Sequence, residues 1–439
     1  MLERYLDRSK GAGADATLTV LESAAGRRRL SQAELEIVLA GHERYVAGRP
    51  GGRRLSLRFS DLSNLDLSRR ELADADFTGS VFDGANMVGA RLQRANLFGC
   101  CFRRADLRNA VMTRADIRGS SLKGANLSGA DLTGADFREG QIAIPHPRKG
   151  LDVVRHEKRN GEVDVANFSG ATLDGSNFHG VSAFSADFTD CSMRGVKLSG
   201  ANLKDANFSG AMLEGAEFAG ANLQGAKLNG AVLTGVDMES MRRLGADLSS
   251  CLGEPADASP ERRDELLDRA RANQTWFETG GRECRPASFN DEDLRTLGSD
   301  LRGMVLTAMS AKGACMVGLD LTGAQLQGAN LEGADLRASI LAGADLRGAR
   351  LLGANLTKAD LRGALLSALP LGAERSTNTH LEESRLRYVN AASADLSGAV
   401  LDRADLTGAD FSEARLKGAS FRGADISTTI GLDFNQEAA

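Results

Sequence analysis

The chain has 439 residues, of which 50 are glycine and only 5% are aromatic, so a conventional core of large side chains is not expected. Its net charge of −5 is mildly acidic and gives no broad field for nucleic acid or a membrane surface. No apolar run is long enough to span a bilayer, and the N-terminus lacks a signal-peptide stretch. The six cysteines show no metal-binding or disulfide spacing. We therefore expect a cytoplasmic protein with no metal and no cofactor.

The first helix signal lies close to the N-terminus. Residues 1–30 show no pattern and are expected to form an irregular tail. Ser31 and Glu34 have the spacing of a capping box, which predicts a helix from residue 31 to 47. Gly48 to Gly52 would end it. We expect this helix to act as a cap, because the terminal repeats of a solenoid need their open edge covered.

From Leu57 onward an apolar residue recurs every five residues. The residue two positions earlier is small, the preceding residue is often Asp or Asn, and the next two are polar or Gly. A period of five suits neither an α-helix nor a strand, so the chain must turn at regular intervals. One large and one small side chain per unit would then point inward and interlock. The first unbroken run is Leu57, Leu62, Leu67, Leu72, Phe77, Phe82, Met87, Leu92, Leu97, Phe102, Leu107, Met112, Ile117, Leu122, Leu127, Leu132, Phe137 and Ile142.

The exceptions to the repeat support the same interpretation. Where the central residue is Ala, the residue two positions earlier is large, so the volume missing from one inward position is added at the other. These pairs are Val181 with Ala183, Met309 with Ala311, and Val389 with Ala391. Gly is frequent two residues after the centre, where the chain turns. Other residue types also occur at this position, namely Arg94, Arg104, Asn109 and Arg114. We therefore expect that the backbone need not have a positive φ at that corner.

The unit Ala-(Asp/Asn)-Leu-X-Gly resembles the pentapeptide-repeat family, whose consensus is A(D/N)LXX, over most of the chain. The resemblance implies an all-β solenoid, a right-handed quadrilateral parallel β-helix. Four units would make one square coil, and stacked coils would be separated by about 4.8 Å, the usual distance between strands.

Interruptions of the period define the expected domains. Residues 143–162 break the first run and shift its phase by one residue. Ser259 and Pro260 predict the start of a second helix, which Gly280 and Gly281 would end. This second insert repeats the order of the first helical segment, so we expect two tandem modules with short helical caps or inserts. The expected organisation is a tail at 1–30, a helical cap at 31–56, module 1 at 57–250 with its loop at 143–162, a helical linker at 251–300, module 2 at 301–431 with a loop at 372–380, and a tail at 432–439.

The loop at 143–162 is the first candidate for a partner-binding site. It is strongly basic, which suits contact with an acidic protein surface, although a solvated loop is the simpler interpretation. Two histidines ten residues apart, without Cys or clustered carboxylates, are a weak metal signal. Loops that break the coil contact the enzyme in topoisomerase-protecting members of the family that this sequence resembles. The candidate residues are His146, Arg148, Lys149, Arg155, His156, Lys158 and Arg159.

Acidic residues of the second run are the other candidate. Side chains twenty residues apart should stack, so that Asp76, Asn96, Asp116 and Asp136 would form one column. Such columns have a structural interpretation, as hydrogen bonds to the turns. The resemblance implies another, mimicry of the DNA phosphate ladder by members that bind DNA gyrase. Only residues 163–250 are clearly acidic, with 10 Asp/Glu against 6 Lys/Arg. The candidates there are Asp187, Asp190, Asp205, Glu214, Glu217 and Asp237.

Evenly spread Asp and Arg provide no convergent carboxylates and no nucleophile–base pair, so we expect no enzyme activity. The first functional hypothesis is a non-enzymatic scaffold that presents faces and loops to a protein partner of unknown identity. The alternative is a DNA-mimicking modulator of DNA gyrase, of the fluoroquinolone-resistance type. The sequence leaves open whether the protein forms oligomers.

Overall fold

The computed structural model describes residues 27–146, 150–372 and 375–432. Away from the inserts, parallel bridges join residues twenty apart, as in the series Asp76, Asn96, Asp116 and Asp136. Four five-residue units therefore complete one coil. The named elements are β1 (Arg28–Arg29), α2 (Gln32–Val46), β2 (Ser60–Asp61), β3 (Gly140–His146), β4 (Gly150–Arg159), α3 (Pro260–Glu278), the 3-10 helix η1 (Arg295–Leu297), β5 (Leu369–Pro370) and β6 (Ser376–Thr377).

The inward assignment of the repeat is confirmed. The first seventeen apolar residues of the first run, from Leu57 to Phe137, are buried in one core. The eighteenth, Ile142, was wrongly assigned, because it lies on strand β3 and is buried outside that core. The three alanine centres and their large neighbours are buried as well, so both side chains of a unit share one packed interior. Backbone hydrogen bonds join successive coils; the N–H of Leu107, for example, donates to the carbonyl oxygen of Asn126 at 2.7 Å. The core is thus a stack of similar layers.

The corners of the coils differ from the expectation. Arg94, Arg104, Asn109 and Arg114 all have φ between 55° and 56°, close to the values of the glycines that occupy the same position in other units. The expectation that positive φ is not obligatory there was wrong. The tight turn imposes the left-handed conformation on whatever residue stands at this corner, at a cost of roughly 1 kcal/mol for a residue with a Cβ atom.

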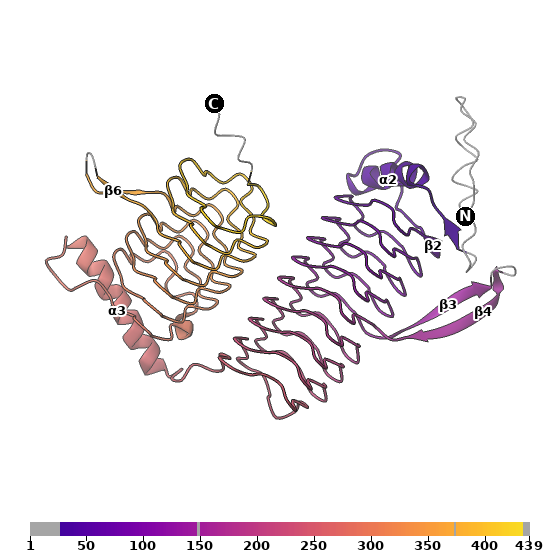
Figure 1. Cartoon of the computed structure of the whole chain (residues 1–439), viewed down its shortest axis with the longest axis horizontal. Helices are drawn as coiled ribbons and strands as arrows, with labels where there is room; N and C mark the ends of the chain where they lie inside the picture. Colours follow the sequence, from indigo (N-terminus) through magenta and orange to yellow (C-terminus); the bar gives the residue numbers. More distant parts are fainter. Residues whose placement is uncertain (1–26, 147–149, 373–374, 433–439) are drawn as a thin grey trace.

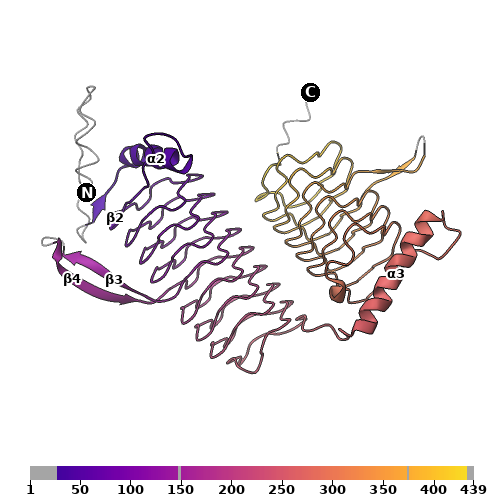
Figure 2. The ribbon, with the colours of Figure 1, turned by 180° about the vertical axis from the view of Figure 1, so that it is seen from behind.

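The coils form two bodies with separate hydrophobic cores. We call residues 55–252 the first arm and residues 287–430 the second arm. The core of the first arm runs from Leu30 to Met241, and that of the second runs from Leu266 to Phe411. In both ribbon views the arms meet near the linker that joins them and diverge toward the two chain ends, in the shape of a V (Figures 1 and 2).

The two long helices each pack on one of these cores. Helix α2 has the expected capping box between Ser31 and Glu34, and it buries Leu35 and Leu39 in the core of the first arm. Helix α3 begins after the N-cap Ser259, with Pro260 in its first turn, as the sequence predicts. It buries Leu266 and Ala270 in the core of the second arm. No helix in the described ranges is long and apolar enough to cross a bilayer.

Two domain boundaries differ from those expected from the sequence. Residues 28–29, placed in the irregular tail, form strand β1, which pairs in parallel with β2. The second arm begins before residue 301, because Ser288 bridges Ser310 and Asp293 bridges Cys315. The 3-10 helix η1 inserts two extra residues between the centres Leu294 and Leu301, which hid the earlier units from a strict period of five.

His42 gives the docking of α2 a pH dependence. Its Nδ1 atom accepts a hydrogen bond from the N–H of Leu55 at 3.1 Å, and burial lowers the pKa of the ring below its usual 6.5. An undocked helix binds the proton more readily, so docking is fully stable above about pH 6.5 and weakens as the pH falls below it. We expect the amides of α2 to lose hydrogen-exchange protection between pH 7.5 and pH 5. His42→Asn, which keeps an acceptor but does not titrate, should remove that pH dependence; equal loss in both proteins would contradict this origin.

Candidate functional site

The basic insert forms a β-hairpin. Strands β3 and β4 pair antiparallel from Gly140 with Arg159 to His146 with Gly150, and the register shifts at Pro145 and His146. The hairpin leaves the first arm and extends beyond it as a separate projection (Figure 1). The segment expected as a loop at 143–162 therefore forms an antiparallel hairpin, and its first strand starts at residue 140. An antiparallel hairpin satisfies its own backbone groups, so it can project without the support of a coil.

The base of the hairpin lies along a row of glycines on the first arm. Ile142 is buried there, and a Cβ atom at Gly99 would lie 2.6 Å from its Cδ1 atom. A Cβ atom at Gly79 would lie 3.1 Å from the same methyl group. Arg159 donates a hydrogen bond from Nη1 to the carbonyl oxygen of Gly99 at 2.8 Å. Glycines twenty residues apart thus leave room for the base of the hairpin, where any side chain would collide.

The structure places the predicted basic residues along this hairpin. His146 lies on β3, while Arg155, His156, Lys158 and Arg159 lie on β4. Lys158 forms an ion pair with Glu139 at 2.7 Å and keeps an exposed side chain. The prediction for Arg148 and Lys149 falls outside the described residues. Within the described ranges, no group of three or more His, Cys, Asp or Glu side chains could hold a metal ion.

The predicted acidic residues do not lie on one face. Asp187 belongs to the column of Asn167 and Asn207, whereas Glu217 belongs to a different column with Lys197. Asp205 is exposed at a corner with φ of 58°, and Asp237 is exposed just before a bend. Asp190 and Glu214 lie where the two arms meet, and both pair with arginine. The structure therefore distributes these carboxylates around the first arm instead of bringing them together.

Many aspartates of the columns are neutralised within their own repeat unit. In the triplet Asp-apolar-Arg, the guanidinium group folds back onto the carboxylate at 2.6–2.7 Å. Two parallel hydrogen bonds hold most of these groups in a fixed geometry. The pairs are Asp106–Arg108, Asp116–Arg118, Asp136–Arg138, Asp293–Arg295, Asp335–Arg337, Asp345–Arg347 and Asp360–Arg362. Columns of this kind present alternating charges, unlike the uniform negative charge of a phosphate backbone.

One face of each arm is used for contact between the arms, which the sequence analysis missed. The Nη1 atom of Arg337 donates to the carbonyl oxygen of Gly230 at 2.6 Å. Lys358 donates to the Thr172 hydroxyl at 3.0 Å, and the Tyr388 hydroxyl donates to Ser169 at 3.1 Å. From Arg337 to Tyr388 the second arm advances in sequence, while its contacts on the first arm go back from Gly230 to Ser169. The two arms therefore run antiparallel.

The contact changes in character along its length. Near the linker it is apolar, with Met212, Val232 and Val317 in a small cluster of their own. Farther out it contains charge. Arg387 pairs with Asp190 at 3.1 Å, whereas Lys358 has no carboxylate at hydrogen-bond distance in the described part of the chain. Burial lowers the pKa of Lys358 and raises that of Asp190, although Arg387 opposes the second shift. Both shifts mean that the charged forms are costly at this contact.

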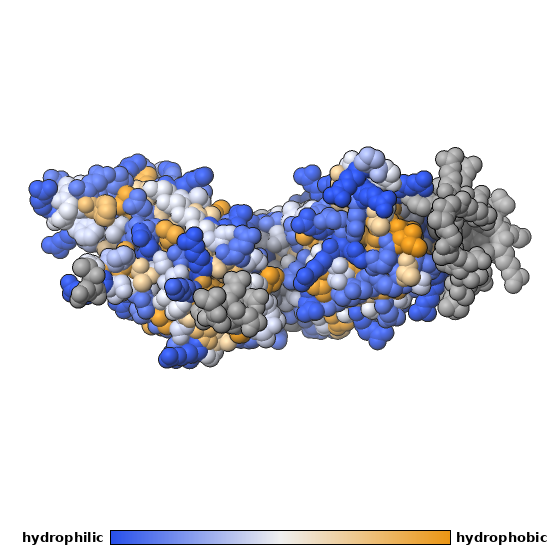
Figure 3. Space-filling model, turned by 90° about the horizontal axis from the view of Figure 1, so that it is seen from above, coloured by the Kyte–Doolittle hydropathy of each residue, from blue (hydrophilic) through white to orange (hydrophobic). Residues whose placement is uncertain are grey.

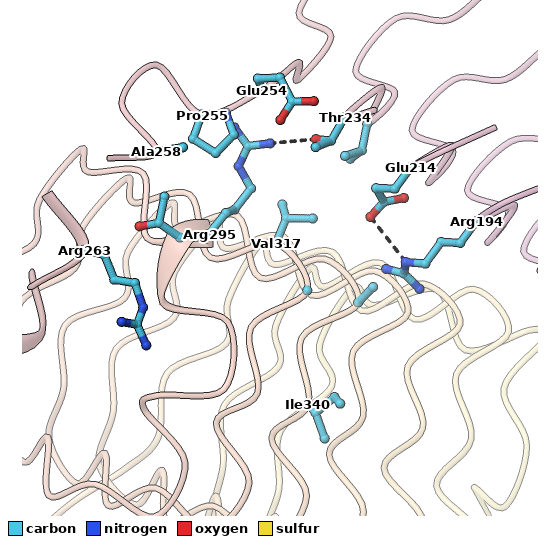
Figure 4. A pocket seen from close by; sticks show the side chains of 14 residues that line it. Arg194, Glu214, Thr234, Glu254, Pro255, Ala258, Arg263, Arg295, Val317 and Ile340 are labelled. Carbon is cyan, nitrogen blue, oxygen red and sulfur yellow. Dashed lines mark hydrogen bonds and ion pairs between the residues drawn. The ribbon is translucent and has the colours of Figure 1, made fainter. Parts of the chain in front are cut away.

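A cavity of about 670 Å³ lies between the arms at the linker. Residues of the first arm, of the linker and of the second arm line it, so it exists only while the arms are in contact (Figure 4). Arg295 crosses it from the second arm and donates to the Gly253 carbonyl oxygen at 2.8 Å. Its volume is within the range of small-molecule sites. Elsewhere, the surface seen from above is mostly hydrophilic, with apolar residues in small groups (Figure 3).

The stacked parallel coils define the chain as a β-helix. A family model for pentapeptide repeats matches it in eight copies and covers more than half of its length, at residues 60–99, 100–138, 166–200, 201–239, 329–367 and 384–423. The chain belongs to the pentapeptide repeat family, whose members fold as right-handed β-helices. No protein with a curated description matches it.

Several solved structures of this family resemble the chain. HetL, involved in heterocyst differentiation regulation in the cyanobacterium Nostoc sp. strain PCC 7120, is 23% identical; 73% of this chain and 93% of that chain are covered, with a TM-score of 0.17. QnrB1, a plasmid-mediated fluoroquinolone resistance protein, is 22% identical over 49% and 98%, with a TM-score of 0.23. Rfr23 from the cyanobacterium Cyanothece 51142 is 27% identical over 32% and 91%, with a TM-score of 0.18. Such low TM-scores support no functional argument.

Proposed function

We propose that this protein is a non-enzymatic scaffold that binds a protein partner through the β3–β4 hairpin. The observation that carries the proposal is the hairpin itself, whose base is fixed on the glycine row while its outer part projects away from the arm. Residues 140–159 contain five Lys/Arg against two Asp/Glu, so the hairpin suits an acidic surface. The arms then serve to hold the hairpin rigidly in place.

We also infer the finer architecture. Four five-residue units per coil support a square cross-section. Helices α2 and α3 would act as caps, because each packs apolar residues onto the start of one core and removes an open edge from solvent. The two arms would correspond to two tandem modules of common design, with the linker between them.

The alternative is a DNA-mimicking modulator of DNA gyrase. It needs a continuous acidic face, because duplex DNA carries one negative charge per about 1.7 Å. The candidate carboxylates lie on several columns, and many column aspartates are paired with arginine in the same unit. We therefore favour the hairpin-based scaffold over the mimic.

A shortened hairpin tests the proposal. Replacing residues 144–155 by Asn-Gly, a favoured two-residue hairpin turn, keeps Ile142 and Arg159 at the base. We expect this variant to keep the melting temperature of the wild type and to lose cross-linking to the partner that the wild type captures in the cells of origin. The matched control deletes residues 369–378 around β5 and β6, which restores the twenty-residue spacing between Arg350 and His380. Equal capture by both variants would rule out the hairpin as the binding element.

The gyrase alternative needs its own assay. The wild type and the shortened-hairpin variant are added at micromolar concentration to a DNA supercoiling reaction of gyrase, with and without a fluoroquinolone. The scaffold proposal predicts no change in either condition. Inhibition of supercoiling, or protection from the drug, would favour the alternative instead.

A further inference from the structure

The two outer edges of the β3–β4 hairpin are not equivalent. Pro145 stands opposite Val154 in the register of the two strands, and a proline has no N–H to donate to the opposite strand. This pair is therefore of the kind whose backbone N–H and carbonyl groups point outward, away from the other strand. Because the two kinds of pair alternate along an antiparallel ladder, the pair of Ala143 and His156 is also of the outward kind.

This alternation gives β4 an open edge. The backbone N–H and carbonyl groups of Val154, His156 and Lys158 point away from β3. On the β3 edge, the last of the three corresponding residues is Pro145, which has no N–H. A proline on an edge strand commonly prevents pairing with another chain. The hairpin thus has a protected β3 edge and a β4 edge that can accept a further strand.

The outer part of β4 has no neighbour in the described chain. Strand β4 is the farther of the two strands from helix α2, and no coil lies alongside its outer part in either ribbon view (Figures 1 and 2). The base of the hairpin is fixed, since Ile142 is buried and Arg159 donates to the Gly99 carbonyl oxygen. An edge held in place before the partner arrives lowers the entropy cost of adding a strand to it.

The charges of β4 indicate what kind of strand fits this edge. Residues 154–159 contain three Lys/Arg and one acidic residue, Glu157. The Glu157 carboxylate already pairs with Arg159 at 3.5 Å. The Lys158 side chain pairs with Glu139 but is still 67% exposed. Opposite charges on neighbouring strands stabilise a sheet and like charges destabilise it, so an acidic strand fits better than a basic one.

We propose that the partner adds an extended acidic segment as a third strand along the outer edge of β4. Backbone hydrogen bonds to Val154, His156 and Lys158 hold the segment, and its acidic side chains lie opposite the basic residues of β4. This proposal rests on the proposed function, because it describes how the hairpin binds. A hairpin that binds through its side chains alone would keep the proposed function and refute strand addition.

A synthetic acidic peptide serves as the probe for this edge. In a peptide of about nine residues, glutamate alternates with threonine and valine, which spans the three outward positions of β4. We expect the peptide to slow hydrogen exchange at the outward amides of β4 and not at those of β3, as measured on the full chain by mass spectrometry. A second peptide has proline in place of threonine and valine, so it keeps the charge but cannot form a strand. Equal binding of the two peptides, or equal slowing on both strands, would overturn the proposal.

Two proline variants test which edge is used. His156→Pro removes an outward N–H from β4, and Ala143→Pro removes the outward N–H of the residue opposite, on β3. Neither N–H belongs to the ladder between the strands, so both variants should keep the hairpin and the melting temperature of the wild type. We expect His156→Pro to weaken binding of the acidic peptide by about tenfold or more in fluorescence anisotropy. Ala143→Pro, and His156→Ala with its N–H intact, should bind like the wild type; equal loss in the two proline variants would refute the assignment to β4.

Two further outcomes would contradict strand addition by a partner. If the wild type self-associates in sedimentation and His156→Pro does not, the edge is occupied by a second copy of the chain. If the shortened hairpin loses the cross-linked partner while His156→Pro keeps it, the hairpin binds through its side chains. The proposed function would then stand and strand addition would not.

Discussion

Leu107→Asp is expected to unfold the first arm at a temperature at which the wild type is intact. The Leu107 side chain is fully buried in the core of the first arm, in the same column as Met87 and Leu127. An aspartate there leaves a cavity and buries a carboxyl group that has no partner. We expect a loss of more than about 4 kcal/mol in the free energy of unfolding. For a body of this size, that corresponds to a fall of roughly 10 °C or more in melting temperature, measured by circular dichroism.

The control uses the same coil and the same new residue. Arg104 is exposed at a corner with φ of 56°, a conformation that aspartate tolerates. Arg104→Asp should therefore change the melting temperature by no more than a few degrees. Similar melting of Leu107→Asp and the wild type would show that the central positions of the repeat do not point inward.

Arg387→Ala is expected to open the contact between the arms without unfolding either arm. The side chain of Asp190 is only 12% exposed, and its carboxylate would remain in the contact without its cation. Removing one partner of a fully buried ion pair costs about 3–5 kcal/mol; because Arg387 is 28% exposed, we expect about 2–3 kcal/mol here. The two cores are separate, so the arms should swing apart. An increase in the radius of gyration by small-angle X-ray scattering measures this.

Three comparisons make the result specific. Arg403→Ala breaks an exposed ion pair with Glu383 on the same arm and should change nothing, because exposed pairs contribute less than about 1 kcal/mol. Adding Asp190→Asn to Arg387→Ala should bring the arms back together, since no charge is then left unpaired.

Burial raises the pKa of Asp190, so the contact is favoured at low pH, where this group is protonated, and is weakened as the pH rises through that pKa. Acidification should therefore bring the arms of Arg387→Ala together again and lower its radius of gyration. If Arg387→Ala has the radius of gyration of the wild type, the ion pair does not hold the arms together.

The paired columns explain why charge alone is a poor guide to function in this chain. The sequence places aspartate before many central residues, and a column of such residues suggests an acidic face. The arginine two positions later has its guanidinium on that aspartate in the units of Asp106, Asp116 and Asp136. Charge that is neutralised inside a repeat unit is not available to a partner. The basic hairpin, where lysine and arginine outnumber acidic residues, is the stronger candidate.

Much of the architecture follows from the sequence alone. A period of five with one large and one small residue per unit determines which side chains are buried, because each coil packs only on its neighbours and needs no distant contact. The capping box at Ser31 and the Ser259–Pro260 helix start are also local signals, and both are confirmed. Local rules are less reliable at the faces of these helices. Tyr45 follows the buried His42 by three residues and Phe277 follows the buried Asn273 by four, which is helical spacing, yet they are 43% and 47% exposed.

Only the tertiary structure decided how the arms meet. Lys358 and Tyr388 stand at the corner position that is usually glycine, with φ of 60° and 54°, but they share this feature with other corner residues such as Arg94. It does not say which residues they approach, because Thr172 and Ser169 are about two hundred positions away. The same holds for the cavity and for the glycine row under the hairpin. The repeat sets the interior of each arm through contacts between neighbouring coils, whereas the contact between arms depends on the linker and on long-range pairing that no local period encodes.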